Sequence, residues 1–152
     1  MKYQICENNI DNIKTECLVM FTKEINQLNF NLNIVPSSLH LYMKEILDNS
    51  KFSGKYKETL FSYIPIKSSV KSLLIIGIGD PEKLSKKRFN NVLKLFLVSL
   101  KKFKFKNISI KTNDLCYLID NEQDVSEKNY VYEEIVKHIA YDNYNFSKYK
   151  SC

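Results

Sequence analysis

Apolar and polar residues alternate along the chain in blocks that predict a succession of strands and helices. The longest apolar block, residues 71–79, holds four consecutive Leu and Ile residues, which is typical of a strand covered on both faces of its sheet. Pro65 places the apolar run at residues 59–66 at a sheet edge or a strand end. Shorter runs rich in strand-forming residues predict further strands at residues 4–6, 17–21, 108–110 and 115–119.

Three segments have the spacing of amphipathic helices. The longest is expected from Ser85, its N-cap, over residues 86–106, and its apolar stripe consists of Phe89, Val92, Leu93, Phe96, Leu100 and Phe103. A second helix is expected after residues 36–38 and runs to about residue 50. A third follows a capping pattern at residues 124–127, after which Val131, Ile135 and Ile139 recur every four residues.

Strands that alternate with helices predict an α/β fold of three layers, in which helices flank a mixed, largely parallel sheet. A length of 152 residues favours a single domain over residues 1–152. The longest apolar stretch has seven residues, against the roughly 20 that cross a bilayer, and the N-terminus has no apolar core of a signal peptide. We therefore expect a cytoplasmic protein with no membrane partner.

The net charge of +6 comes from 22 Lys and a single arginine, Arg88. Lys and Asn have A/T-rich codons and both are abundant, so the composition of the genome can produce this bias without an acidic partner. Arg is the residue favoured for bidentate contacts to phosphates and bases. The charge by itself is therefore only a weak indication of nucleic-acid binding.

Cysteine and histidine show no spacing typical of a metal or catalytic site. The four cysteines, Cys6, Cys17, Cys116 and Cys152, form no C-x-x-C pair, and neither His40 nor His138 is near them in sequence. We expect free thiols, the first three in apolar surroundings. The acidic residues at 133–134 and 120–124 are expected on a helix surface and in a solvated loop. The residues therefore predict no catalytic, cofactor-binding or metal-ligating side chain in this chain.

Two other patterns could carry binding. The segment Gly77-Ile78-Gly79 lies between a strand and a helix, where a phosphate-binding turn would sit, but a dinucleotide fingerprint needs a small residue where Glu82 stands. A tight strand-to-helix turn is the preferred interpretation. Lys87, Lys94 and Lys101 repeat every seven residues on one helix face. They predict a solvated face, and nucleic-acid binding over residues 86–106 is the alternative. The solvated face is preferred because the spacing of the neighbouring aromatic residues places these rings on the buried stripe, where they are not free to stack on bases.

Four segments carry a resemblance to a known family. They are residues 13–19, residues 52–60, residues 73–79 with the following Leu84 and Arg88, and residues 140–151. In this order they resemble the opening strand, the "F-x-G-K-x-G-E-x-L" turn, the "L-L-V-G-L-G" strand and the "A-Y-x-F-x-x-Y-K" segment of the N-terminal domain of the leucyl (cytosol) aminopeptidases, peptidase family M17. One departure is Lys57, where the family usually carries Gly, which suggests a relaxed constraint on that turn.

The resemblance implies a macro-domain-like fold and a non-catalytic role in assembly and in shaping access to the active site. The parent enzymes it points to are hexamers that release N-terminal amino acids from peptides. Their two divalent metals, zinc or manganese, belong to a C-terminal catalytic domain that is absent from this chain. The chain alone is therefore not expected to be an enzyme. The alternative is a stand-alone macro-like module that binds ADP-ribose, another nucleotide or DNA.

Overall fold

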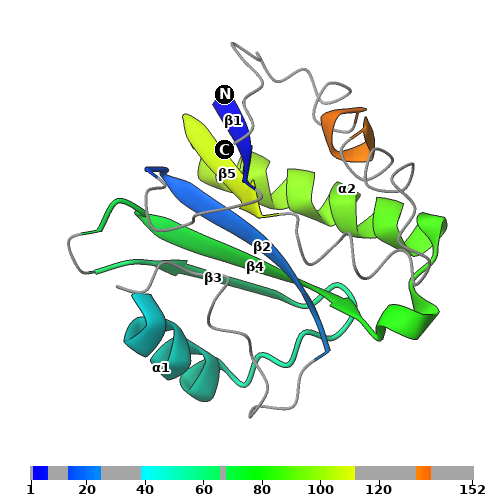
Figure 1. Cartoon of the computed structure of the whole chain (residues 1–152), viewed down its shortest axis with the longest axis horizontal. Coiled ribbons are helices and arrows are strands. Elements are labelled where there is room, and N and C mark those ends of the chain that lie inside the picture. The colour runs from blue at the N-terminus through cyan, green and yellow to red at the C-terminus, as the bar shows by residue number, and fades with distance from the viewer. Residues whose placement is uncertain (1, 7–13, 25–38, 66–67, 112–132, 138–152) are drawn as a thin grey trace.

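The computed structural model describes residues 2–6, 14–24, 39–65, 68–111 and 133–137 of the chain. These residues form five strands, two longer helices, a short 3-10 helix and a helical stretch at residues 133–137, arranged around one sheet (Figure 1). In chain order the elements are β1 (Lys2–Cys6), β2 (Cys17–Lys23), α1 (His40–Ser50), β3 (Thr59–Tyr63), β4 (Ser72–Gly79), η4 (Pro81–Lys83), α2 (Lys86–Phe103) and β5 (Asn107–Lys111).

The sheet has the strand order β1-β5-β2-β4-β3. The pairings β1–β5, β5–β2 and β2–β4 are parallel, whereas β3 runs antiparallel to β4 at the edge of the sheet. The predicted mixed, largely parallel sheet is therefore confirmed. β4 lies between β2 and β3 and is buried along its whole length, as its continuous apolar run predicts.

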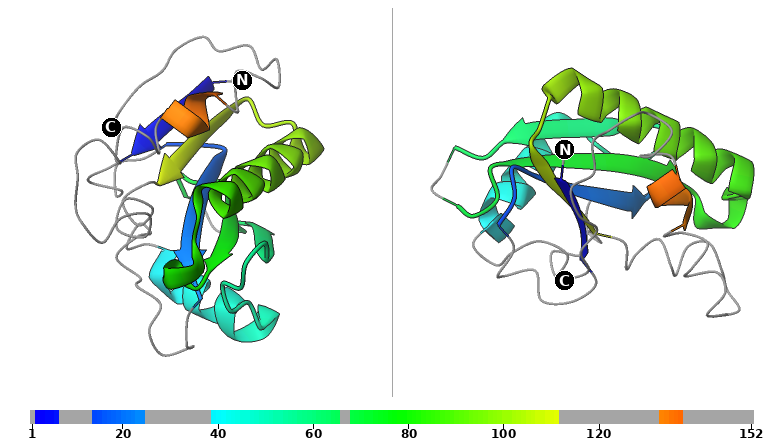
Figure 2. Two further views of the ribbon diagram at one scale, coloured as in Figure 1. Left: turned by 90° about the vertical axis from the view of Figure 1, so that its right-hand side faces the viewer. Right: turned by 90° about the horizontal axis from the view of Figure 1, so that it is seen from above.

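The two faces of the sheet are covered by different helices, so the fold has the predicted three layers (Figure 2). Successive side chains of a strand point to opposite faces. Val19 and Phe21 of β2 accordingly pack in the cluster that contains α2, whereas Leu18 and Met20 pack in the cluster that contains Met43 of α1. Each face therefore has its own apolar core.

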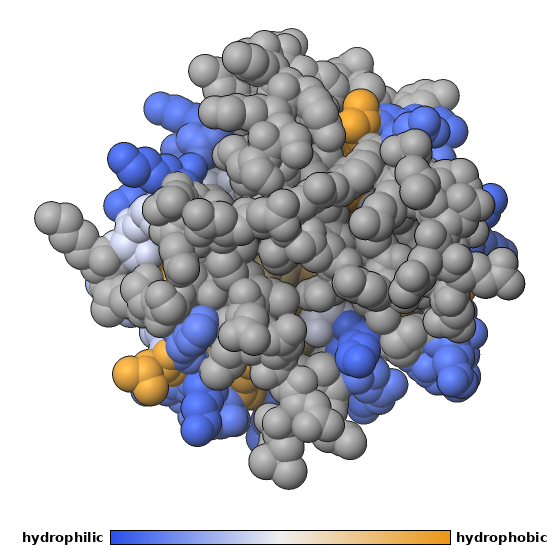
Figure 3. Space-filling model, viewed as in Figure 1, coloured by the Kyte–Doolittle hydropathy of each residue, from blue (hydrophilic) through white to orange (hydrophobic). Residues whose placement is uncertain are grey.

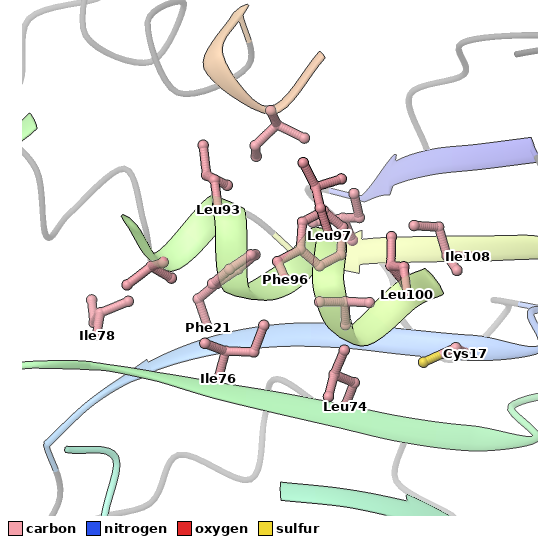
Figure 4. Close-up of a cluster of buried hydrophobic side chains, with 14 of the residues drawn as sticks. Cys17, Phe21, Leu74, Ile76, Ile78, Leu93, Phe96, Leu97, Leu100 and Ile108 are labelled. Atoms are coloured by element: carbon pink, nitrogen blue, oxygen red, sulfur yellow. The ribbon is translucent and has the colours of Figure 1, made fainter. Parts of the chain in front are cut away.

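The core on the α2 face is the larger of the two. Figure 4 shows its side chains between α2 and the sheet. α2 begins where predicted, because the Ser85 Oγ accepts a hydrogen bond from the Arg88 N–H at 3.2 Å. Its apolar stripe lies on the sheet, and the rings of Phe96 and Phe21 meet edge to face with centroids 5.8 Å apart. Ile135, from the helical residues 133–137, is also fully buried in this core.

Several predicted boundaries were wrong. The position of β3 at the sheet edge is as expected from Pro65, and the strand ends at Tyr63, before that proline. α1 begins at His40, and its N-cap is Leu39, which makes no side-chain capping bond. α2 ends at Phe103 because Lys104 takes a left-handed conformation, so the helix does not extend to residue 106. The expected strand at 115–119 and the capping pattern at 124–127 lie outside the described residues.

The described surface is mainly polar. Figure 3 shows hydrophilic side chains around the rim of the view, with only a few hydrophobic ones among them. The large hydrophobic side chains that are exposed are Leu41, Tyr63 and Val98. Within the described ranges, neither α1 nor α2 combines the length and the apolar character that a membrane-spanning helix needs.

Candidate functional site

The segment Gly77-Ile78-Gly79 belongs to β4 and is covered by the loop at residues 52–58. The Gly77 N–H donates to the Glu58 carbonyl at 2.7 Å, and the Gly79 N–H donates to the Gly54 carbonyl at 3.0 Å. A β-carbon on Gly77 would lie 2.2 Å from the Lys55 carbonyl oxygen, so only glycine allows the loop to come this close. Gly77 therefore serves close packing inside the strand, and only Gly79, with φ +76°, has a turn conformation.

The same contacts bear on phosphate binding. A phosphate-binding turn presents unpaired backbone N–H groups to its anion, whereas those of Gly77 and Gly79 are already bonded to loop carbonyls. The residues after the strand are acidic: the Asp80 carboxylate accepts a hydrogen bond from the Glu82 N–H at 3.0 Å. This arrangement favours a structural role over phosphate binding, but the expected turn is corrected for Gly77, since only Gly79 of the two stands in it.

The Glu58 carboxylate holds the covering loop in shape. It accepts hydrogen bonds from the Ser53 hydroxyl at 3.1 Å and from the Lys55 N–H at 3.0 Å. Tyr56 fastens the loop to α2, since its hydroxyl accepts from the Asn91 side-chain amide at 3.2 Å and the Arg88 guanidinium lies over its ring at 4.6 Å. The single arginine of the chain thus has a structural partner.

The lysines of α2 lie on its outer surface. The predicted repeat of Lys87, Lys94 and Lys101 is exposed. Lys102 is exposed as well, and so are Lys104 and Lys106, which stand in the turn after the helix. No Asp or Glu occurs between residues 86 and 111 of the sequence, a stretch that carries nine Lys and Arg. The stretch is therefore a basic surface. The Glu16 side chain lies at its C-terminal end and accepts a hydrogen bond from the Lys106 N–H at 2.6 Å.

Sequence reasoning missed a group of aromatic side chains at the end of this basic surface. We call it the aromatic cluster: Phe61, Tyr63, Phe103 and Phe105. The rings of Phe61 and Phe103 stack with centroids 3.8 Å apart, and Tyr63 meets Phe61 edge to face at 4.9 Å. Phe103 was expected to be buried but is only partly so. The alternation of Lys and Phe over residues 102–106 is the signal that could have indicated the cluster.

The cysteine and histidine predictions are settled only in part. Cys17 is a free, fully buried thiol, and burial raises its pKa to about 12, although hydrogen bonds with Ser72 and Leu74 partly oppose this. His40 begins α1, which packs on the opposite face of the sheet from Cys17, so the two do not form a catalytic pair. Cys116, His138 and Cys152 lie outside the described residues.

The described residues do not fit a metal centre. Nowhere in that part of the chain do three or more His, Cys, Asp or Glu side chains come close enough together to hold an ion. Glu133 and Glu134 lie on the helical stretch 133–137, where Glu133 is exposed and Glu134 is partly buried. The acidic residues at 120–124 lie outside the described ranges.

This three-layer fold places the chain among the macro-domain-like α/β proteins. It is similar in structure to the macrodomain of Thermus aquaticus DarG, with a TM-score of 0.59 and 8% identity over 98% of this chain and 96% of that one. A tomato leucine aminopeptidase mutant has a TM-score of 0.70 and 10% identity, and covers 99% of this chain, which matches 32% of the tomato chain. At these identities the likeness shows the fold alone.

The sequence gives the family. The model of the cytosol aminopeptidase family, N-terminal domain, matches residues 18–152, and the chain belongs to this family. It is 23% identical to a cytosol aminopeptidase of Haemophilus influenzae over 99% of the chain and 29% of the relative. It is also 26% identical to a cytosol aminopeptidase of Buchnera aphidicola, over 83% of the chain and 26% of the relative. The chain thus spans less than a third of these relatives.

Proposed function

We propose that residues 1–152 are the non-catalytic N-terminal domain of a leucyl aminopeptidase-like protein. The observation that carries this proposal is the family match over residues 18–152, combined with a span of only 29% of the Haemophilus relative. The parent releases N-terminal amino acids from peptides in the cytoplasm. Two divalent metals, zinc or manganese, held by the C-terminal catalytic domain, activate the attacking water.

In this proposal the domain contributes assembly rather than chemistry. It contacts the catalytic domain and the sister subunits of a hexamer, and it shapes the access of peptides to the active site. The occupation of the backbone donors of Gly77 and Gly79 by the covering loop supports a role outside the chemistry.

The first test is the gene sequence beyond codon 152, where an in-frame metallopeptidase domain supports the proposal and a stop codon favours a degraded remnant of such a gene instead. The second compares the parent with a variant that lacks residues 1–152. Light scattering should report a hexamer for the parent and a smaller species for the variant, and each should be assayed with leucine p-nitroanilide. A shortened protein that remains a hexamer with unchanged kinetics would contradict the assembly role.

The alternative function is a stand-alone module that binds ADP-ribose, another nucleotide or DNA. The macrodomain likeness favours it, whereas Glu82 and the bonded N–H groups of Gly77 and Gly79 count against a phosphate at that turn. Calorimetry with ADP-ribose tests nucleotide binding. If no heat is released at millimolar ligand, the chain does not bind ADP-ribose. Retention of duplex DNA at about 50 mM salt, where lysine–phosphate contacts are strong, tests DNA binding through α2.

A further inference from the structure

β3 forms one edge of the described sheet, with β4 on one side of it and no described strand on the other (Figure 1). Proteins commonly protect an edge strand from pairing with other chains by placing a charged residue or a proline within it. β3 consists of Thr, Leu, Phe, Ser and Tyr, so it contains neither. The strand therefore retains the capacity to pair with another chain.

The pairing with β4 fixes which backbone groups of β3 point outward. The Glu58 carbonyl, just before the strand, accepts a hydrogen bond from the chain of β4 at 2.7 Å, and the Ile64 N–H, just after it, donates one at 2.9 Å. Bonded and non-bonded positions alternate along an antiparallel pair. Thr59, Phe61 and Tyr63 are therefore the residues that direct their N–H and C=O groups away from β4.

The last of these outward groups is closed by α1. The Tyr42 hydroxyl donates to the Tyr63 carbonyl at 2.6 Å and lies 2.8 Å from the Ser62 hydroxyl. This contact agrees with the outward direction of the Tyr63 carbonyl. The groups that remain open are both groups of Thr59 and of Phe61 and the Tyr63 N–H, for which the described residues supply no partner. The exposed side chain of Thr59 leaves room for an approaching strand.

Exposed lysines border this open edge at both ends. Lys55 and Lys57 come shortly before the strand, and both are exposed. Further along it, the ring of Phe61 stacks on Phe103 with centroids 3.8 Å apart. This contact brings residues 102–106, which carry three exposed lysines, to the same edge. A strand added to β3 therefore meets positive charge at both of its ends.

These charges favour an acidic partner over a second copy of the chain. Two copies paired through β3 would bring the lysines of one near those of the other, which costs free energy. Two described carboxylates contact the same segments, and both already accept backbone hydrogen bonds: Glu58 from the Lys55 N–H at 3.0 Å and Glu16 from the Lys106 N–H at 2.6 Å. The lysines outnumber them, so the edge has an excess of positive charge.

We propose that β3 binds an extended, acidic segment of a partner protein as an added strand. Backbone hydrogen bonds to the open groups of Thr59, Phe61 and Tyr63 hold the segment, as in other complexes that extend a sheet at its edge. The side chains of an added strand point alternately to the two faces. Acidic residues at every second position therefore lie on the α2 face, beside the lysines. This surface is separate from the proposed aminopeptidase role, and the failure of either proposal leaves the other standing.

The test uses the full chain and a fluorescein-labelled peptide of about eight residues in which Glu and Val alternate, a length that spans β3. In an extended strand the N–H groups of the Glu residues point to one edge and those of the Val residues to the other, so only one set pairs with β3. Fluorescence anisotropy compares two further peptides, methylated on the Glu or on the Val nitrogens. We expect one methylated peptide to bind at least about tenfold more weakly, because each backbone bond that is lost weakens binding, and the other to bind as the unmodified peptide does.

Variants of the strand test the same contact from the side of the protein. Thr59→Pro removes an outward N–H and leaves the bonds to β4 intact, since a proline is tolerated where the N–H of an edge strand faces solvent. It should weaken binding about tenfold, because one bond is lost and the proline ring obstructs the added strand. Thr59→Ala keeps the N–H and is the matched control, with binding unchanged. Circular dichroism verifies that both variants are folded.

The lysines are tested by single changes of charge. Lys102→Gln and Lys106→Gln should each weaken binding about threefold at low salt, as is usual for exposed ion pairs. Lys44→Gln removes an exposed charge from α1 on the opposite face of the sheet and should leave binding unchanged. If polyglutamate binds as tightly as the alternating peptide, charge alone attracts both and the proposal is overturned.

Amide hydrogen exchange measured by NMR locates the bound peptide. Exchange at the Thr59, Phe61 and Tyr63 amides should slow when the peptide is added, whereas the amides of Leu60 and Ser62 already bond to β4 and should not change. Absence of binding at millimolar peptide overturns the proposal, as do equal affinities of the two methylated peptides. A chain that dimerises in light scattering, and becomes a monomer on Thr59→Pro, would show that a second copy occupies the edge instead.

Discussion

Lys57 adopts a left-handed backbone conformation, φ +66°, in the loop that covers β4. Its N–H donates to the Gly77 carbonyl at 3.0 Å, so the conformation is fixed by the contact between loop and strand. The resemblance implies that the family usually carries Gly at this position. The turn still demands a conformation that favours glycine.

We predict that Lys57→Gly stabilises the protein by about 0.5 kcal/mol. A left-handed residue with a β-carbon costs roughly 1–2 kcal/mol, and the greater backbone entropy that glycine loses on folding offsets part of the gain. Urea unfolding measures the change. Lys57→Ala is the control, since it removes the same side chain and keeps the β-carbon. A Gly variant no more stable than the Ala variant would contradict the prediction.

Cys17 links stability to alkaline pH. Burial raises the pKa of its thiol to about 12, above its ordinary value near 9. Between these two pH values the folded chain retains a proton that the unfolded chain releases, so the stability contribution is complete below pH 9 and declines as the pH rises toward 12. We therefore expect wild type to lose more unfolding free energy than Cys17→Ala between about pH 9 and 11, measured by urea titrations. Parallel losses in both proteins would argue against this.

At the scale of the element, the first turn of α2 contains charges of the wrong sign for its own stability. Lys86, Lys87 and Arg88 occupy it, with no acidic residue. The positive end of the helix dipole repels cations and attracts anions at this end. The same helix has Lys101 and Lys102 in its last turn, where cations are favourable.

We predict that Lys87→Glu raises the free energy of unfolding by about 0.5 kcal/mol at low ionic strength, because it replaces a repulsion with an attraction at the helix N-terminus. Lys94→Glu makes the same change of net charge in the middle of the helix and serves as the control. Thermal unfolding at low salt and at about 1 M salt, where screening is strong, separates the two effects. An equal gain from both variants would indicate that only net charge matters.

At the scale of the whole molecule, both apolar cores are formed within the described residues. The core on the α2 face draws on β2, β4, β5 and α2, and the one on the α1 face draws on β2, β4 and α1. Burial of apolar surface on both faces of one sheet is the main favourable contribution to folding. We therefore expect the chain to fold by itself.

We predict that the purified chain folds and does not hydrolyse leucine p-nitroanilide, with or without added zinc or manganese. A two-metal site needs several carboxylates that converge at fixed geometry and are held by further hydrogen bonds. Circular dichroism confirms folding in the same samples that are assayed. Metal-dependent turnover that survives repurification and disappears when Asp or Glu residues of this chain are changed would contradict the prediction.

Elements whose signal is local were predicted well. β4 follows from an apolar run that only a strand covered on both faces can bury, and α2 follows from a stripe at helical spacing with Ser85 as its cap. The ends of elements were predicted less well. The extension of α2 to residue 106 failed because the apolar spacing continues through Phe103, while the left-handed turn at Lys104 carries no glycine to mark it.

The sequence by itself determined the fold class, the three layers and the family. The spacing of apolar residues and the order of the motifs depend only on positions along the chain, and not on which segments meet in space. Tertiary structure alone decided the role of Gly77, since its need for glycine comes from the Lys55 carbonyl, which another segment brings against it. It also decided the aromatic cluster. Phe61 and Phe103 are far apart in sequence, and their rings stack only because β3 forms the sheet edge beside the end of α2.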